Sequence, residues 1–492
     1  MARFVLALDQ GTTGSTALVF DEEGKVRGRA YSEFRQFYPR PGWVEHDPEE
    51  IWRVTLRVAR AALRKARARK LEAVGITNQR ETTLVWNKKT GRPVHRAIVW
   101  QDRRTAPACE SLRASGHERT IRERTGLVID PYFSATKLQW ILENARRSDR
   151  TASLAFGTVD SWLVWKLTGG AAHVTDYTNA SRTMLFDIHR LDWDPELLDL
   201  FRVPREILPD VVPSAGPLAT TSKKAVGFEA PVAGIAGDQQ AALFGQACYR
   251  EGMVKNTYGT GCFLLMFTGR DAVRSERGLV TTLACDEAGR PAYALEGSIF
   301  VAGAAVQWLR DGLGLVRRAD ETEKLARKVD SSLGVYVVPA FVGLGAPYWE
   351  PGARGAILGL TRGVRREHLV RATLEALAYQ TRDVVDTMVA ESGRALAGLR
   401  VDGGAAANDF LMQFQADILG VTVDRPRLVE TTALGAALLA GVGTGLWKPG
   451  EAERLRKRDR LFRPRLRPEV RENLYEGWRR AVSAVRAHAH HG

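Results

Sequence analysis

Two turns rich in glycine and hydroxyl residues, one in each half of the chain, have the side chains best suited to binding phosphate. The first lies in LALDQGTTGSTALVF (6–20), where an apolar run ends at Asp9 and the tip consists of Gly11, Thr12, Thr13, Gly14, Ser15 and Thr16. The second lies in VKNTYGTGCFLLMF (254–267) and has Thr257, Gly259, Thr260 and Gly261 at its tip, without the acidic residue. Small residues let backbone N–H groups approach phosphate oxygens closely, and hydroxyls add further donors. For either turn alone, an ordinary β-hairpin is the better interpretation, but the pair favours a duplicated clamp on a nucleotide phosphate tail.

Strands on both sides of each turn are needed to hold these residues, and the apolar runs predict them. In the first half we expect strands at 4–9, 16–20, 25–34, 72–77 and 231–235, and helices at 48–70, 131–145 and 237–245. In the second half we expect strands at 252–258, 261–267 and 292–296, and helices at 301–311, 366–391 and 407–419. The second half therefore begins like the first. We predict an α/β protein with two domains, 1–248 and 249–492, and a ligand site in the cleft between them.

Length and composition exclude several classes of protein. A chain of 492 residues is too long for one core and indicates two to four structural units. The 45% hydrophobic and 26% charged residues are typical of a globular protein, and no run of about 18 apolar residues predicts a membrane span. The short apolar stretch before Asp9 indicates a buried strand and not a secretion signal, so we expect a cytoplasmic protein. The four cysteines are widely separated and form no CxxC pair, which predicts reduced, buried thiols.

The net charge of +14 raises the possibility of a nucleic-acid partner. Two basic stretches, Arg64 to Lys70 and Arg454 to Arg467, contain too few interleaved aromatic residues for a single-strand binder. The first lies on the predicted helix 48–70, whose apolar positions Trp52, Leu56, Ala59 and Leu63 recur at helical spacing. A basic face exposed to solvent is the better interpretation, and we expect no nucleic-acid partner.

Two common classes of phosphate-transfer protein are also excluded. No GxxxxGK[ST] motif is present, because the Gly24-Lys25 pair precedes a valine and opens a strand. The chain also lacks a glycine-rich loop with the HRD and DFG elements of a protein kinase.

Several longer segments resemble those of the FGGY carbohydrate kinases. They are the LALDQGTT turn, NQRE (78–81), VWQDRR (99–104), YFSATKLQWILEN (132–144), GIAGDQQAALFG (234–245), NTYGTGCF (256–263), GAILGLTRGVRREHLVRATLE (355–375) and RVDGGAAANDFLMQFQADILG (400–420). NQRE and NTYGTGCF are most similar to the branch that phosphorylates glycerol. The resemblance runs from about residue 4 to 480 and implies two actin-like, ribonuclease H-like ATPase domains that close on ATP. It also implies Mg²⁺, the product sn-glycerol 3-phosphate, a role in glycerol catabolism, and a homo-oligomer, either a dimer or a tetramer.

Asp238 is the candidate base for such a transfer. Phosphoryl transfer to an alcohol needs a base near the hydroxyl, cations on the phosphates and exclusion of water. Asp238 follows the buried strand PVAGIAG and precedes a helix whose N-terminus favours an ionised carboxylate. On the sequence alone, a role as helix N-cap is equally good. Asp9, with Asp238, is expected to hold Mg²⁺ directly or through water; the alternative is a strand-end aspartate that bonds the turn backbone.

The resemblance implies a polyol site built around Arg80 and Glu81. Without it, this adjacent pair is better interpreted as surface charges. With it, the two side chains grip vicinal hydroxyls, and the substrate-binding set is Arg80, Glu81, Trp100, Tyr132, Asp238, Gln239 and Phe263. Trp100 and Phe263 would form apolar walls for the carbon backbone, although core packing is the commoner role of aromatic residues.

Nine residues are expected to bind ATP by the same resemblance. Thr12, Thr13, Gly14, Thr16 and Thr260 would contact the phosphates, and Gly303, Gln307, Gly404 and Asn408 would flank the adenosine. Thr16 is a departure, because most members of the glycerol branch resemble this turn but have an arginine there. We therefore expect weak ATP binding or compensation by another cation.

Two alternatives remain open from the sequence. The chain could act on a pentulose or gluconate, as other FGGY kinases do, or it could be an actin-like ATPase that polymerises or moves partners. In the latter case Arg80, Glu81 and Asp238 would have no evident role. The segment 220–230, TTSKKAVGFEA, lacks both the glycine-rich loop and the histidine through which some family members are regulated, so neither control is expected.

Overall fold

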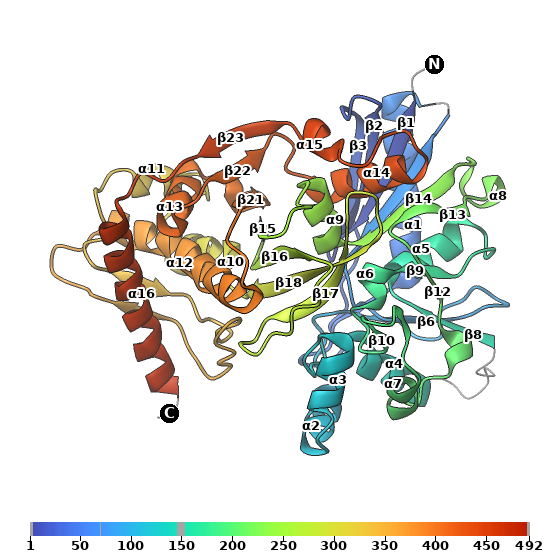
Figure 1. The fold of residues 1–492 in the computed structure, drawn as a ribbon, viewed down its shortest axis with the longest axis horizontal. Coiled ribbons are helices and arrows are strands. Elements are labelled where there is room, and N and C mark those ends of the chain that lie inside the picture. The colour runs from blue at the N-terminus through green and yellow to red at the C-terminus, as the bar shows by residue number, and fades with distance from the viewer. Residues whose placement is uncertain (1–2, 69, 145–152, 490–492) are drawn as a thin grey trace.

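The computed structural model describes residues 3–68, 70–144 and 153–489 and contains two large sheets (Figure 1). The first has the order β13-β14-β5-β1-β2-β3 and the second the order β17-β18-β16-β15-β21-β22-β23. The first sheet comprises β1 (Phe4–Gln10), β2 (Gly14–Asp21), β3 (Val26–Glu33), β5 (Ala73–Asn78), β13 (Ala215–Thr220) and β14 (Pro231–Gly237). The second comprises β15 (Met253–Tyr258), β16 (Cys262–Gly269), β17 (Val280–Cys285), β18 (Pro291–Ile299), β21 (Gly398–Asp402), β22 (Val423–Pro426) and β23 (Arg458–Phe462).

The two sheets share one topology. In the first, β3, β2 and β1 are antiparallel neighbours, and β5 and β14 continue the sheet in parallel with β1. In the second, β18, β16 and β15 are antiparallel, and β21 and β22 continue in parallel with β15. The two phosphate turns are the β1–β2 and β15–β16 connections. The predicted duplication of an α/β unit is therefore confirmed.

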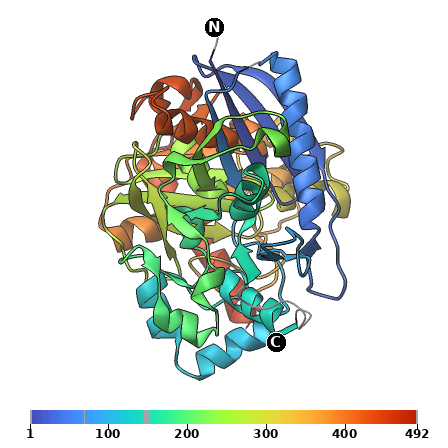
Figure 2. The same cartoon turned by 90° about the vertical axis from the view of Figure 1, so that its right-hand side faces the viewer.

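Helices cover both faces of the first sheet, which explains why β1 is an almost continuous apolar run. Leu6 and Leu8 pack in one core cluster with residues of α1 (Pro48–Ala66). Val5 and Ala7, which alternate with them, pack with residues of α14 (Thr431–Gly443). Figure 2 shows α1 as the blue helix along one side of the blue strands, with the red-coloured part of the chain on the other.

Helix α14 comes from the second half of the sequence but lies against the first sheet (Figure 1). Its approach is close enough that a Cβ at Gly75 on β5 would be 2.1 Å from the carbonyl oxygen of Ala436. On the other side, a Cβ at Gly435 would be 1.8 Å from the carbonyl oxygen of Ala241. Only glycine fits at such positions, so these two residues lock α14 between β5 and α9 (Asp238–Gly245).

Several predicted boundaries were wrong. The helix expected at 48–70 ends at Ala66, because Arg67 is left-handed (φ 52°) and its N–H caps the carbonyls of the last turn. The helix expected at 131–145 is α4 (Ser134–Asn144), which begins three residues later than expected; residue 145 lies outside the described residues. The helix expected at 301–311 is α10 (Gly303–Gln307) followed by a π turn (Trp308–Gly312). The three remaining predicted helices correspond to α9, α12 (Arg366–Ser392) and α13 (Asp409–Leu419). Arg64 and Lys65 lie exposed in the last turn of α1, as expected of a solvated face.

The other elements complete the two halves. In the first half they are β4 (Glu45–His46), β6 (Leu84–Asn87), β7 (Ala97–Ile98), α2 (Ala106–Ala114), α3 (Glu118–Thr125), β8 (Leu154–Gly157), α5 (Val159–Leu167), β9 (Val174–Asp176), α6 (Tyr177–Ala180), β10 (Phe186–Asp187), β11 (Asp192–Trp193), α7 (Pro195–Leu200), β12 (Asp210–Val212) and α8 (Lys223–Val226). In the second they are α11 (Glu321–Ala326), β19 (Tyr336–Val338), β20 (Ala356–Leu358), the short helix Gly404–Ala407, α15 (Ala452–Leu455) and α16 (Pro468–Ala489). All four cysteines are buried free thiols, as predicted. Within the part of the chain that the structure describes, no helix combines the length and the apolar character needed to cross a membrane.

Candidate functional site

The β1–β2 turn has the tight geometry expected of a phosphate clamp. The N–H of Gly11 donates to the carbonyl of Gly14 at 2.9 Å, and Thr13 stands exposed at the tip. A Cβ at Gly14 would lie 2.7 Å from the Tyr31 ring and 2.8 Å from the carbonyl oxygen of Ser32. Glycine is therefore required here because β3 packs directly against the turn.

The β15–β16 turn repeats this geometry and is joined to α10. The N–H of Gly259 donates to the carbonyl of Gly261 at 2.8 Å. The carbonyl of Thr260 accepts from the N–H groups of Ala302 (2.8 Å) and Ala304 (3.1 Å) at the start of that helix. A Cβ at Gly303 would lie 2.6 Å from the carbonyl oxygen of Gly259. Thr260 and Gly303 are thus brought together.

Gly404 and Asn408 lie on the other side of the same turn. The preceding Gly403 has φ 84°, and its Cβ would be 2.4 Å from the carbonyl oxygen of Tyr258. Gly404 itself is exposed with open space where a Cβ would be. Asn408 caps α13 by accepting from the N–H of Leu411 at 2.9 Å. Gln307 is exposed at the end of α10. Of the four residues expected to flank the adenosine, Gly303 borders the second turn directly and Gly404 borders it through Gly403.

Arg80 and Glu81 are not surface charges, because their side chains are only 2% and 1% exposed. They follow β5, and Glu81 has a left-handed backbone (φ 61°). For a residue other than glycine such a conformation is strained and is concentrated at functional sites. Arg80 Nη2 lies 3.3 Å from the hydroxyl of Tyr132, and Arg80 Nε lies 3.3 Å from Asp238 Oδ1. The interpretation from sequence alone was wrong, and the one implied by the resemblance fits.

Trp100 lies between the residues expected to bind a polyol and the β1–β2 turn, the first of the two turns expected to bind phosphate. Its Nε1 donates to Thr12 Oγ1 at 2.9 Å. Its ring meets Tyr132 edge-on at a centroid distance of 5.6 Å and Phe263, from the second half, at 6.5 Å. These three aromatic residues therefore form one cluster beside Arg80, in which Tyr132 also accepts from Arg80 Nη2.

Asp238 is the first residue of α9, with Gly237 as the N-cap. Its side chain is 31% exposed, and Oδ1 accepts from the N–H of Gln239 at 2.7 Å. It is therefore not the N-cap itself, and among the described residues nothing donates a hydrogen bond to its second oxygen, Oδ2. The neighbouring Gln239 is buried, and its Oε1 accepts from Lys255 Nζ on β15. Burial lowers the pKa of Lys255 to about 8.

Asp9 faces the same region from the end of β1. Burial, Asp238 and Glu430 together raise the pKa of Asp9 to about 7. Among the described residues, nothing donates a hydrogen bond to its carboxylate from the turn, which disfavours the role of bonding the turn backbone. No group of three or more metal-binding side chains occurs in residues 3–68, 70–144 and 153–489. A pair of carboxylates that repel each other fits Mg²⁺, which takes one or two protein carboxylates and otherwise prefers water and phosphate oxygens.

Two buried charged residues of this region were not predicted. Arg182, which follows α6, and Glu296, on β18, are 0% and 2% exposed and both contact the Arg80–Glu81 pair. The only signal in the sequence was Glu296 itself, a charged residue inside the apolar run YALEGSI. Arg182 carried no signal, because it lies about 100 residues from Glu81 in the sequence.

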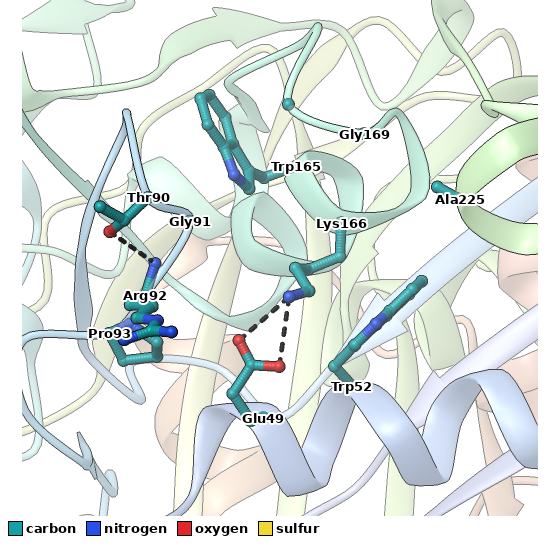
Figure 3. A pocket seen from close by; sticks show the side chains of 11 residues that line it. Glu49, Trp52, Thr90, Gly91, Arg92, Pro93, Trp165, Lys166, Gly169 and Ala225 are labelled. Atoms are coloured by element: carbon teal, nitrogen blue, oxygen red, sulfur yellow. Dashed lines mark hydrogen bonds and ion pairs between the residues drawn. The ribbon is translucent and has the colours of Figure 1, made fainter.

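A separate open concavity of about 750 Å³ lies on the first half of the chain (Figure 3). Its lining includes Glu49, Trp52, Arg92, Trp165 and Lys166 and none of the predicted site residues. Lys166 Nζ donates to both carboxylate oxygens of Glu49, at 3.0 and 3.2 Å. Because its lysine is already neutralised, we assign this concavity no role in the chemistry.

Comparisons with known proteins match the chain over nearly its whole length. The model of the FGGY family of carbohydrate kinases matches residues 4–245 with its N-terminal domain and residues 254–444 with its C-terminal domain. Glycerol kinase 2 of Thermotoga maritima is 60% identical, and the glycerol kinase of Caldanaerobacter subterraneus 58% identical, each over 98% of both chains. The crystal structure of Plasmodium falciparum glycerol kinase with ADP has a TM-score of 0.93 at 35% identity and covers 98% of each chain.

Proposed function

Because the chain belongs to the FGGY family of carbohydrate kinases and is a glycerol kinase, we propose that it phosphorylates glycerol with Asp238 as the general base. The observation that carries this proposal is the placement of a buried Arg80–Glu81 pair beside a half-exposed Asp238, with Arg80 Nε 3.3 Å from Asp238 Oδ1. A small polyol offers several hydroxyls to such a set, and a hydroxyl is both donor and acceptor.

In the proposed mechanism, Arg80 Nε–H and the Glu81 carboxylate bind two hydroxyls of glycerol. Asp238 accepts the proton of the third as its oxygen attacks the γ-phosphorus of ATP. The new oxygen–phosphorus bond forms while the bond from the γ-phosphorus to ADP breaks, which gives sn-glycerol 3-phosphate and ADP. General-base catalysis of this kind contributes about 10²- to 10⁴-fold to the rate. Trp100 and Phe263 would exclude water from the carbon side.

For the nucleotide, we propose that Thr12, Thr13, Gly14, Thr16 and Thr260 contact the phosphates. We propose that Gly303, Gln307, Gly404 and Asn408 flank the adenosine. The equivalent geometry of the two turns supports the first set, and the exposed Gly404 beside the second turn supports the other. Mg²⁺ bound with ATP would be held by Asp9 and Asp238 and would neutralise phosphate charge.

The substrate and the base can be tested together. In a coupled ADP-release assay, glycerol should be preferred over pentuloses and gluconate, and ATP turnover without a polyol should be negligible. Asp238→Asn should lower kcat by about 10²-fold or more and leave the affinity for a non-hydrolysable ATP analogue nearly intact. Asp194→Asn is a matched control, because Asp194 caps α7 by accepting from the N–H of Leu197 at 2.9 Å. Retained turnover in Asp238→Asn would remove Asp238 as the base, and a preference for five- or six-carbon sugars would overturn the substrate.

The family resemblance further leads us to propose a homo-oligomer, a dimer or a tetramer, with domains 1–248 and 249–492 and a role in glycerol catabolism. Light scattering on the purified protein tests the first point, and a monomer at micromolar concentration would contradict it.

A further inference from the structure

Four buried charged side chains form a closed ring of ion pairs, and two of them are the proposed polyol residues Arg80 and Glu81. Arg80 donates to both carboxylate oxygens of Glu296, at 2.6 and 3.0 Å. Arg182 donates from Nη2 to Glu296 at 2.9 Å and from Nε to Glu81 at 2.6 Å. Arg80 Nε lies 3.6 Å from Glu81, which closes the ring. We call these four residues, none more than 2% exposed, the charge ring.

The charge ring fixes the orientation of the Arg80 guanidinium and thereby determines which N–H group can bind a ligand. A guanidinium has five N–H groups. Nη1 donates to Glu296 and to Gln240 (3.2 Å), and Nη2 donates to Glu296 and to Tyr132 (3.3 Å). Nε, which carries the remaining N–H, donates no hydrogen bond within the described residues and lies 3.3 Å from Asp238 Oδ1 and 3.6 Å from Glu81 Oε1. Because the two bonds from Arg80 to Glu296 are a bidentate fork, Glu296 sets the rotation of the guanidinium plane.

Arg182 fixes the orientation of the Glu81 carboxylate, as Glu296 fixes that of the Arg80 guanidinium. It donates to one carboxylate oxygen, Oε1, and among the described residues no partner is found for Oε2. The strained backbone of Glu81 is also fixed, since its carbonyl accepts from Ser134 Oγ at 3.1 Å and Thr83 Oγ1 at 3.0 Å. One acceptor of Glu81 and one donor of Arg80 are thereby left for hydroxyls.

Glu296 comes from the opposite half of the molecule. It lies on β18 of the second sheet, opposite Leu265 and Val280, whereas Arg80, Glu81 and Arg182 belong to the first half. Although burial alone would raise the pKa of Glu296, Arg182 and Arg80 lower it to about 2. The carboxylate therefore stays ionised between the two arginines across the ordinary pH range.

We propose that Glu296 and Arg182 are positioning residues for the polyol: Glu296 orients Arg80, and Arg182 orients Glu81, so that one donor and one acceptor meet two neighbouring hydroxyls. This inference rests on the proposed function, because it takes glycerol as the ligand. It makes the selectivity for vicinal hydroxyls depend on a residue from the second half that does not touch the substrate.

The test is Glu296→Gln, which keeps the shape of the side chain and removes its charge. We expect KM for glycerol to rise about 10- to 100-fold, the range for loss of a charged hydrogen bond, while KM for ATP stays unchanged. The preference for glycerol over propane-1,3-diol, which lacks the central hydroxyl, should fall by a similar factor. A purely structural role would lower the melting temperature without changing this preference.

Controls separate the possible outcomes. Glu375→Gln removes another buried glutamate that accepts from an arginine, Arg371 Nε at 2.7 Å on α12, and should change neither KM nor preference. If Glu296→Gln does not fold, Arg182→Lys is the second variant, because a lysine keeps the charge but lacks the planar guanidinium that bonds Glu81 and Glu296 together. It must show the same loss of preference. A wild-type preference in the folded variants would overturn this inference alone, whereas a wild type that does not phosphorylate glycerol would overturn the proposed function and this inference with it.

Discussion

Replacing Thr16 by arginine should tighten ATP binding. Thr16 on β2 is the Cα partner of Asp9 on β1 and of Tyr31 on β3. Directly opposed residues on antiparallel strands have Cβ atoms about 5 Å apart on one face of the sheet. An arginine at position 16 would therefore extend over the first phosphate turn beside Asp9 and supply the cation that most of the glycerol branch has there.

The size of the effect follows from two opposing contributions. A charge-assisted hydrogen bond to phosphate contributes about 1.5–3 kcal/mol, which corresponds to about 10- to 100-fold in affinity. Asp9 competes for the new guanidinium, because burial, Asp238 and Glu430 raise its pKa to about 7 and an adjacent cation would favour its ionised form. A partly exposed pair of this kind is worth about 0–1 kcal/mol. The net gain in ATP affinity should therefore lie near the lower end of the 10- to 100-fold range, about a tenfold decrease in Kd.

Titration calorimetry with a non-hydrolysable ATP analogue and Mg²⁺ measures this gain. Thr16→Met is the matched control, because it adds length without charge and should leave Kd within about twofold, a difference below 0.5 kcal/mol. The advantage of Thr16→Arg over Thr16→Met should shrink as salt is raised, since an exposed charge is screened. Equal tightening in both variants, or none in Thr16→Arg, would refute the placement of the triphosphate over this turn.

Two further predictions follow from the site. The melting temperature of Asp9→Asn, measured relative to that of the wild type, should rise as the pH is raised from about 4 to 7. The pKa of Asp9 is raised to about 7 in the folded wild type, so Asp9 stays protonated there at pH values where the same carboxylate is ionised in the unfolded chain, and the wild type loses stability. A difference in melting temperature that does not depend on pH would contradict this pKa. Gly303→Ala should lower both the melting temperature and ATP affinity, because its Cβ would lie 2.6 Å from the carbonyl oxygen of Gly259, whereas Gly404→Ala, with open space around it, should weaken only ATP binding. Unchanged ATP affinity in Gly404→Ala would exclude adenosine from that side of the turn.

Local patterns in the sequence predicted the elements that carry the site. Both phosphate turns lie where the Gly/Thr tips and flanking apolar runs placed them, and Asp238 lies at the junction of β14 and α9. Each of these depends on residues that are close in the chain. The end of α1 was predicted too late because Arg67, in a left-handed conformation, has no marked turn propensity in the sequence.

Long-range contacts could not be predicted. The burial of Arg80 and Glu81 depends on Arg182 and Glu296, which are about 100 and more than 200 residues away in the sequence. Helix α14 returns to the first sheet, and the need for glycine at positions 75 and 435 can be explained only once both packed surfaces are known. The family resemblance supplied the proposed roles of Arg80 and Glu81, but it did not identify Arg182 and Glu296, which orient their side chains.

A crystal structure with glycerol and a non-hydrolysable ATP analogue would show whether Asp238 is placed to act as the base. We expect an Asp238 carboxylate oxygen within about 2.6–3.2 Å of a glycerol hydroxyl, with that hydroxyl in line with the γ-phosphorus and the triphosphate between the two turns. Glycerol and nucleotide in unconnected sites, with Asp238 far from the γ-phosphorus, would contradict this expectation.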